Sequence, residues 1–154
     1  MKNNIIGIIG QGFVGTAVNE GLKDFFKIET YDIAKESTCK SIEELSIKSD
    51  IIFVCLPMDK NGTCHLGIIE PVLKELNELG KKTIVVKSTI PPGTTEKWNK
   101  NYSNIDIVFN PEFLTEANSI NDFKNQNRII IGGPKTAASR VRRIFVKAFP
   151  KILD

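Results

Sequence analysis

The chain has 154 residues, and its 21 Lys and Arg residues against 18 Asp and Glu residues give a formal charge of +3. This length corresponds to one domain, and a composition that is 41% hydrophobic and 25% charged excludes the disordered, collagen-like and coiled-coil classes. The small positive charge favours a soluble protein over a nucleic-acid binder, and no apolar run is long enough to predict a membrane span.

Short apolar runs alternate with helical patterns along the whole chain. Strands are expected at Ile5 to Ile9, Lys27 to Tyr31, Asp50 to Leu56, Thr83 to Lys87, Ile105 to Phe109 and Arg128 to Ile131. Helices are expected at about 14–24, from Ser41 onward, at 67–79 and at 136–149, the second of them with a Ser41/Glu44 capping box. The strand runs are continuous, as in parallel strands buried on both faces. The pattern predicts an α/β fold, a doubly wound parallel six-stranded sheet in one domain, residues 1–154.

The first predicted strand runs into a glycine-rich loop with the sequence Gly-Gln-Gly-Phe-Val-Gly. In this context Gly10 allows a tight turn, Gly12 lets the backbone approach a pyrophosphate, and Gly15 lets the next helix pack closely on the strand. The helix N-terminus would offer free N–H groups to the anion. Phe13 and Val14, within the same loop, join these glycines as candidate cofactor-binding residues.

Asp32 ends the second predicted strand, about 20 residues after the glycines, where a carboxylate accepts hydrogen bonds from the adenosine ribose of a dinucleotide. Its negative charge would repel the extra phosphate of NADP, and Lys35 is not expected to reverse that preference. NAD is therefore the expected cofactor. The alternative is that Asp32 merely caps a turn before Ile33.

Two further loops leave predicted strands at the edge of the sheet where ligands bind in such folds. Pro57 ends the third strand abruptly, where the nicotinamide of the cofactor would lie. In the next loop, two prolines would hold the Thr89 hydroxyl in place ahead of a helix N-cap expected at Thr94. The alternative for this loop is a rigid connection without a functional role. The candidate cofactor-binding residues in these loops are Leu56, Pro57, Ser88 and Thr89.

The fifth predicted strand is followed by two carboxylates, Glu112 and Glu116. If a helical turn begins at Glu112, Glu116 shares its face, and like charges at that spacing destabilise a helix unless something uses them. Such a pair would offer one protonated and one ionised carboxyl for acid/base catalysis. The alternative is that acidic residues simply favour a helix N-terminus.

In order along the chain, these motifs resemble the UDP-glucose/GDP-mannose 6-dehydrogenase family. The resemblance is carried by the glycine loop, Asp32, the Lys-Ser-Thr-Ile-Pro-Pro-Gly-Thr run at 87–94, the Asn-Pro-Glu-Phe-Leu-Thr-Glu run at 110–116, and residues 122–133. It implies a Rossmann-like NAD-binding domain and an NAD-dependent, two-step oxidation of the C6 alcohol of a nucleotide sugar to a carboxylate through a cysteine thioester, an activity of polysaccharide biosynthesis. It further implies that Thr89 helps to order a water, that Glu112 and Glu116 lie beside C6, and that Glu116 acts in thioester hydrolysis.

The resemblance also implies parts that this sequence does not contain. Family members carry the nucleophilic cysteine, a lysine, the nucleotide-sugar site and a dimer-forming helix in later domains. We therefore expect a domain that binds NAD but takes a nucleotide-sugar substrate only with a second domain or polypeptide; a homo-oligomer stays open. Ala117-Asn118 depart from the family, which often has glycine there. Two alternatives remain: a non-catalytic NAD-binding module, and a hydroxyacid-type dehydrogenase, against which the paired glutamates argue.

The remaining reactive or charged residues are expected to have ordinary structural roles. The three cysteines contain no Cys-x-x-Cys pair, which predicts free thiols in a reducing cytoplasm. Cys55 is expected to pack as a small apolar residue, Cys39 to lie in a polar loop with nothing around it, and the Cys64-His65 pair to form neither a zinc site nor a catalytic dyad. No metal site is predicted. Arg128 is assigned no chemistry, and a solvated helix face is expected for Arg140, Arg142, Arg143 and Lys147.

Overall fold

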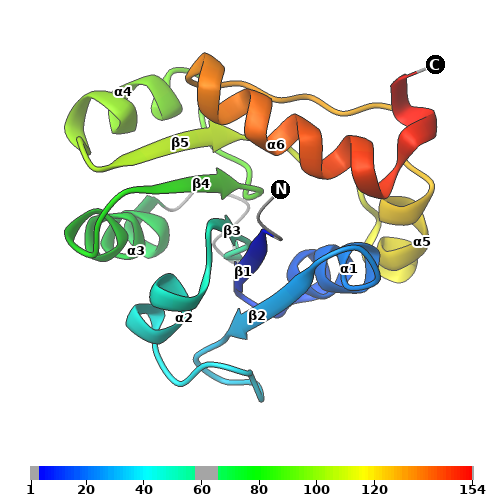
Figure 1. The fold of residues 1–154 in the computed structure, drawn as a ribbon, viewed down its shortest axis with the longest axis horizontal. Coiled ribbons are helices and arrows are strands. Elements are labelled where there is room, and N and C mark those ends of the chain that lie inside the picture. The colour runs from blue at the N-terminus through cyan, green and yellow to red at the C-terminus, as the bar shows by residue number, and fades with distance from the viewer. Residues whose placement is uncertain (1–3, 58–65, 154) are drawn as a thin grey trace.

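The computed structural model describes residues 4–57 and 66–153. Their strands form one parallel sheet in the order β2-β1-β3-β4-β5, covered by helices on both faces (Figure 1). The strands are β1 (Ile5–Ile9), β2 (Lys27–Tyr31), β3 (Ile51–Val54), β4 (Lys82–Val86) and β5 (Ile105–Phe109). The helices are α1 (Phe13–Leu22), α2 (Ile42–Lys48), α3 (Leu66–Glu78), α4 (Thr94–Asn101), α5 (Ser119–Lys124) and α6 (Lys135–Ala148), with 3-10 turns η1 (Glu116–Asn118) and η2 (Pro150–Leu153).

Two hydrophobic cores lie on opposite faces of the sheet, because successive side chains of a strand point to opposite sides. Phe53 of β3 belongs to the core under α1, α5 and α6, whereas its neighbours Ile52 and Val54 belong to the core under α2, α3 and α4 (Figure 1). Every residue of β3 is buried. Burial on both faces explains the continuous apolar runs and confirms the doubly wound arrangement. Among the helices of the described residues, none combines the length and the hydropathy that a membrane span requires.

The expected elements are found with small shifts in their ends. β1, β2 and β5 have the predicted bounds, β3 is shorter, and β4 begins and ends one residue early. The helix start at Ser41 is confirmed, since the Ser41 hydroxyl accepts the N–H of Glu44 at 3.0 Å. The Glu44 carboxylate accepts the N–H of Lys40 at 2.7 Å, one residue before the N–H of Ser41 that it would accept in the predicted capping box.

The N-cap predicted at Thr94 is wrong. Gly93, with φ 83° and ψ −9°, is the N-cap of α4, and Thr94 is the first helical residue. The reason is a turn that ends at Thr94, in which the N–H of Thr94 donates to the carbonyl of Pro91 at 3.2 Å. With Pro92 second and a positive-φ glycine third, this is a type II turn, and it leads the chain directly into the helix.

The sixth strand, predicted at Arg128 to Ile131, is not formed. Near this segment only Gly132 pairs with the sheet, in an antiparallel bridge to Phe109 with N···O distances of 2.7 and 2.8 Å. A parallel strand needs a crossover that returns the chain along the sheet. The six residues of α5 cover about 9 Å, less than the roughly 16 Å of a five-residue strand. The chain therefore re-enters beside the carboxyl end of β5, and the sheet in the described residues has five strands.

Candidate functional site

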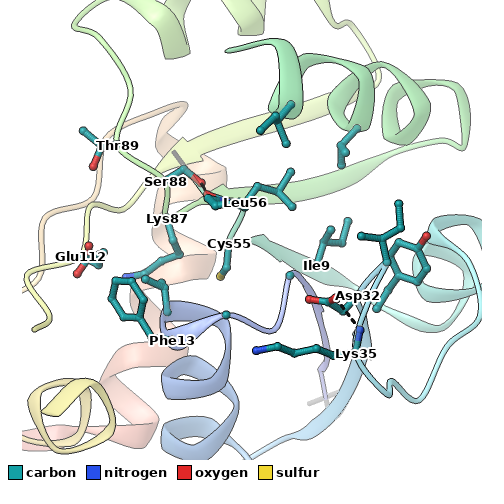
Figure 2. Close-up of a pocket in the computed structure, with 18 of the residues that line it drawn as sticks. Ile9, Phe13, Asp32, Lys35, Cys55, Leu56, Lys87, Ser88, Thr89 and Glu112 are labelled. Carbon is teal, nitrogen blue, oxygen red and sulfur yellow. Dashed lines mark hydrogen bonds between the residues drawn. The ribbon is translucent and has the colours of Figure 1, made fainter. Parts of the chain in front are cut away.

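A cavity of about 800 Å³ opens at the carboxyl ends of the strands (Figure 2). It spans the boundary between β1 and β3, where the strand order reverses and where doubly wound sheets bind ligands. The predicted site residues that line it are Gly10, Gly12, Phe13, Val14, Asp32, Leu56, Pro57, Ser88, Thr89 and Glu112. Gly15 and Glu116 are not among the lining residues. Helices α2 and α3 add an apolar wall that the sequence analysis missed, made of Ile42, Ile68 and Val72.

Two of the three glycines in the glycine loop, Gly10 and Gly15, lie so close to the backbone that a side chain would not fit. Gly10 has φ 93°, and a Cβ atom there would lie 2.3 Å from the carbonyl oxygen of Cys55. A Cβ atom on Gly15 would lie 1.9 Å from the carbonyl oxygen of Gly10. Gly15 therefore acts from beneath the loop, by letting α1 pack against it. Gly12 differs, since nothing lies within 4 Å of its Cβ position, and as the N-cap of α1 it has no side-chain cap.

Asp32 organises the backbone at the end of β2. Its carboxylate accepts N–H groups from Gln11 at 2.7 Å, Ala34 at 2.8 Å and Lys35 at 2.9 Å. Burial would raise the pKa of Asp32, but these N–H donors and the Lys35 charge together hold it below its usual value. The turn-capping alternative is thus correct as a description of these bonds. It leaves the ligand role open, because Asp32 also lines the cavity.

Lys35, which the sequence analysis set aside, takes part in the same cluster. Its ammonium donates to the carbonyl of Gln11 at 2.7 Å, and its side chain lines the cavity beside Asp32 (Figure 2). The cluster links the loop after β2 to the glycine loop after β1. This end of the cavity is therefore fixed by contacts between two neighbouring loops.

Side chains from three loops meet at the other end of the cavity. The Ser88 hydroxyl donates to the carbonyl of Leu56 at 2.7 Å and ties the loop after β4 to the loop after β3. Thr89 is exposed and lines the cavity, and so does the half-buried Glu112 (Figure 2). Both residues predicted for chemistry in these two loops are therefore close to the same space.

The helical turn predicted from Glu112 is wrong, and with it the spacing predicted for the two carboxylates. Residues 111–115 are not helical, and Glu116 begins η1. Two carboxylates stabilise this extended backbone by accepting hydrogen bonds from it. The Glu112 carboxylate accepts the N–H of Leu114, while Asp122 accepts both the N–H and the hydroxyl of Thr115, at 2.9 and 2.7 Å. Glu112 and Glu116 consequently do not form an i, i+4 pair.

Lys87 is a charged residue of the cavity that was not predicted as a site residue from the sequence. It is only 2% exposed, and its ammonium donates to the side-chain oxygen of Asn110 at 2.8 Å. The nitrogen lies 5.7 and 5.8 Å from the ring centroids of Phe123 and Phe145. Burial lowers the pKa of Lys87 to about 8. The two-residue period of β4 places Lys87 on the same buried face as Val85, and this was the available signal.

The two described cysteines are buried. Cys55 packs in the core, as expected, and burial raises the pKa of its thiol to about 12. The expectation for Cys39 is wrong, since it is 3% exposed and its sulfur lies 3.7 Å from the Glu29 carboxylate. Its N–H pairs with the carbonyl of Thr30 at 2.9 Å, which folds the loop back onto β2. Cys64 and His65 lie outside the described residues.

The basic residues of α6 are exposed, as the sequence predicts: Arg140, Arg142, Arg143 and Lys147. Arg140 and Arg143 border a polar cavity of about 360 Å³ beside Asp50 and Lys82, which flank the amino ends of β3 and β4. Arg128, to which no chemistry was assigned, stacks on the Phe113 ring at 4.6 Å. No group of three or more His, Cys, Asp or Glu side chains among the described residues could hold a metal ion.

The chain matches the family model for the UDP-glucose/GDP-mannose dehydrogenase family, NAD binding domain, over residues 19–149. It belongs to this family. NAD is therefore the coenzyme of the domain, and the fold and the position of the cavity agree with that assignment. The match begins within α1 and ends just past α6, so it covers β2 to β5 and the helices that follow them, and it does not include β1 or the glycine loop.

Two relatives and one solved structure illustrate the similarity. The UDP-glucose 6-dehydrogenase TuaD of Bacillus subtilis is 36% identical over 104 residues, which cover 60% of this chain and 23% of that protein. The UDP-glucose 6-dehydrogenase of Campylobacter jejuni is 29% identical over 129 residues, covering 81% and 33%. A UDP-glucose dehydrogenase structure from Pyrobaculum islandicum has a TM-score of 0.79 at 24% identity, covers 92% of this chain and 44% of that one, and shows the fold. The chain thus spans a third or less of the length of these two relatives.

Proposed function

We propose that this chain is the coenzyme-binding part of a nucleotide-sugar 6-dehydrogenase, which oxidises a C6 alcohol to a carboxylate with NAD. One observation carries the proposal. A single cavity in this family's NAD-binding domain joins the glycine loop and Asp32 at one end to Thr89 and Glu112 at the other. The similar UDP-glucose 6-dehydrogenases favour UDP-glucose or a related nucleotide sugar as substrate.

The cavity fits a dinucleotide at each of its parts. The open space in front of Gly12, at the uncapped N-terminus of α1, suits a pyrophosphate. Asp32 offers carboxylate oxygens to the adenosine ribose. The Ile33 side chain lines the cavity yet is 93% exposed, and an adenine ring would cover it. This leaves the nicotinamide over Pro57, toward Thr89.

Bound in this cavity, NAD would supply the hydride acceptor for oxidation of the substrate carbon. In the proposed reaction, Thr89 orders a water beside that carbon, and the Glu112 carboxylate accepts a proton there. Glu116 is exposed in η1 and outside the cavity lining, so its proposed part in thioester hydrolysis depends on residues from elsewhere in the protein. Thr89 and Glu112 are therefore the residues that this domain would contribute directly.

The proposed reaction also needs a cysteine thiolate, and neither described cysteine is suited to supply it. A catalytic cysteine is accessible and has a lowered pKa. Cys55 is buried with its pKa raised to about 12, and burial also raises the pKa of Cys39. We propose that the nucleophile and the nucleotide-sugar site come from a further segment or polypeptide, and that the protein works in the cytoplasm, where such thiols stay reduced.

Coenzyme binding and turnover, measured separately, test this function. The purified chain is titrated with NADH and NADPH by fluorescence, and NAD reduction is followed with UDP-glucose and GDP-mannose. We expect NADH to bind more tightly than NADPH, and no turnover until a polypeptide carrying the remaining family domains is added. Turnover by the chain alone would overturn the requirement for a second part. Absence of NADH binding would overturn the proposed function itself.

A non-catalytic NAD-binding module is the second candidate. The observation in its favour is the position of Glu116, exposed and away from the cavity in which a catalytic carboxylate would act. This candidate predicts that no added polypeptide produces turnover and that Glu116→Gln changes no measurable property. A loss of reconstituted activity in that variant would eliminate it.

A further inference from the structure

The charged residues that line the cavity differ sharply in burial. Asp32 and Lys35 lie at the end beside β2, where Lys35 is exposed, whereas Lys87 and Glu112 lie at the opposite end (Figure 2). Lys87 alone among these four is almost fully buried, at 2% exposure. A charge held in a low-dielectric wall acts on its surroundings far more strongly than the same charge in water. Lys87 is therefore the charge that a ligand at this end of the cavity would experience most.

Its neighbours hold the Lys87 ammonium in one place. The Asn110 amide nitrogen donates to the carbonyl of Ile130 at 2.8 Å. This bond turns the amide oxygen toward Lys87, whose ammonium donates to it at 2.8 Å. The rings of Phe123 and Phe145 lie within 6 Å on the side of α5 and α6, at 5.7 and 5.8 Å, a distance at which aromatic faces attract a cation. The side chain thus has a defined position rather than freedom to turn into water.

The strand order places Lys87 near the nicotinamide rather than the adenosine. Asp32 follows β2 and the pyrophosphate loop follows β1, while Lys87 follows β4 on the far side of β3. A dinucleotide with its ribose at Asp32 and its pyrophosphate at Gly12 must extend its second half toward β3 and β4. Oxidised and reduced coenzymes have the same phosphates and adenosine, and they differ by one positive charge on the nicotinamide ring.

We propose that Lys87 makes this cavity select the reduced coenzyme over the oxidised one. The inference rests on the proposed function, because it requires the dinucleotide to lie in that orientation. A buried cation repels the positively charged nicotinamide ring of the oxidised coenzyme but does not repel the neutral ring of the reduced coenzyme. On the protein, the hydride-transfer equilibrium is then shifted toward the reduced coenzyme, and its release is slowed. Lys87 acts here as a specificity-determining residue, without direct chemistry.

Proton loss from Lys87 should abolish this selection. The groups that face it from the described residues are the Cys55 thiol beside β3, the Glu112 carboxylate after β5, the Asn110 amide and the two phenylalanine rings of α5 and α6. Of these, the thiol is neutral across the useful pH range, since its pKa is about 12. The pKa of Lys87 is about 8, so the preference for NADH should be strong at pH 6.5 and weak at pH 9.5.

The test is the ratio of the dissociation constant of NAD to that of NADH, measured by NADH fluorescence and by displacement of NADH with NAD. At pH 6.5 we expect this ratio to be about tenfold larger in the wild type than in Lys87→Met, the factor that a unit charge about 10 Å away produces at an effective dielectric constant near 20. Lys35→Met is the matched control. It removes a cation from the adenosine end, so it can change both affinities but should leave their ratio unchanged.

The outcomes separate this inference from the proposed function. If neither NAD nor NADH binds to the wild type, the proposed function fails. If both bind and the ratio is equal in the wild type and in Lys87→Met, the inference is overturned while the function stands. The wild type provides a measurement that needs no folded variant, since its own ratio should fall between pH 6.5 and 9.5. A ratio that is constant over this range would contradict the role of Lys87.

Discussion

The two ends of the cavity are built in different ways. At the end formed by the loops after β1 and β2, backbone groups meet two charged side chains: the Asp32 carboxylate accepts three N–H groups, and the Lys35 ammonium donates to the carbonyl of Gln11. At the end formed by the loops after β4 and β5, the groups are side chains that differ in exposure. Thr89 is exposed, Glu112 is half-buried, and Glu116 is outside the lining.

The difference indicates which part of the function this domain can complete by itself. In the proposed function, the adenosine and the pyrophosphate of the coenzyme bind at the first end, where the predicted contacts come from two adjacent loops. The proposed chemistry takes place at the second end, where Thr89 and Glu112 line the cavity. A domain of this construction is expected to bind NAD alone and to need further residues around Thr89 and Glu112 before it can act on a substrate.

The largest effect is expected from filling the space beneath the glycine loop. In Gly15→Ala the new methyl group would lie 1.9 Å from the backbone oxygen of Gly10, which cannot move without disturbing α1. We expect a loss of about 3 kcal/mol or more in the free energy of unfolding, together with loss of NADH binding. Urea denaturation and fluorescence titration measure the two quantities.

Gly12→Ala is the matched control for that substitution. Nothing lies within 4 Å of its Cβ position, and its φ of −70° suits alanine, so stability should stay within about 1 kcal/mol of the wild type. The methyl group would nevertheless fill the space proposed for the pyrophosphate, and NADH affinity should fall. Unchanged NADH affinity in this variant would show that the coenzyme does not use the glycine loop.

The next effect concerns the stability contribution of Lys87 at the other end. Its pKa is lowered from 10.5 to about 8 in the folded chain. Between those values the unfolded chain holds a proton that the folded chain has lost, so stability rises with pH in this window. The rise amounts to about 3 kcal/mol at most, from roughly 1.4 kcal/mol per pKa unit. Below pH 8 the buried charge makes a constant unfavourable contribution.

The variant Lys87→Met tests the pH-dependent contribution of the Lys87 charge to the free energy of unfolding. The variant loses the charge but leaves the Asn110 oxygen without its donor, which costs about 1–3 kcal/mol, so the difference at pH 7 alone is not diagnostic. The diagnostic quantity is the change with pH. The wild type should gain up to about 3 kcal/mol relative to the variant between pH 7 and 10.5 in urea denaturation. Parallel pH profiles for the two proteins would contradict the lowered pKa.

Asp32→Asn tests the end of the cavity formed by the loops after β1 and β2, and an effect of intermediate size on coenzyme affinity is expected. The substitution removes the charge that should attract ribose hydroxyls and repel a 2′-phosphate, so NADH affinity should fall about tenfold to a hundredfold and the preference over NADPH should narrow. Fluorescence titration with both coenzymes measures this change. If the preference for NADH over NADPH is unchanged, Asp32 acts only as the cap of its turn.

The same variant predicts a pH effect of defined sign. The folded-state pKa of Asp32 is lowered, so its contribution to stability is fully present above the unfolded pKa, near 4, and is lost as pH falls through the folded value. The stability difference between wild type and Asp32→Asn should therefore be constant at neutral pH and shrink in acid. A difference that grows in acid would contradict the lowered pKa.

The same contrast explains which features the sequence predicts. The glycine loop and Asp32 are predicted from short sequence motifs and three strand ranges from periodicity, and the structure has these strands and places both motifs on the cavity. The sixth strand predicted at Arg128 to Ile131 is not formed because the preceding crossover is too short. The length of that crossover cannot be seen from the apolar run itself. The helical turn at Glu112 is not formed, because the N–H of Thr115 donates to the Asp122 carboxylate, seven residues later, instead of pairing within a helix.

Lys87 illustrates the same limit in the candidate site. Its burial follows from the strand period, but its environment is assembled by Asn110, Phe123 and Phe145, which come from three later elements. The sequence motif therefore identifies Lys87 but does not predict which side chains surround it. The properties that depend on long-range assembly, such as a lowered pKa, become visible only in the folded chain.

The smallest effect is expected from Glu116→Gln. Glu116 is exposed in η1, so both the free energy of unfolding and the NADH affinity of the chain should stay unchanged, within about 0.5 kcal/mol. Glu112→Gln, by contrast, weakens the acceptor for the N–H of Leu114 and should lower stability measurably. Activity reconstituted with the remaining family domains should fall in both variants if both carboxylates act on the substrate. If only Glu112→Gln loses activity, Glu116 has no part in the chemistry, and the acid/base work at this end belongs to one carboxylate.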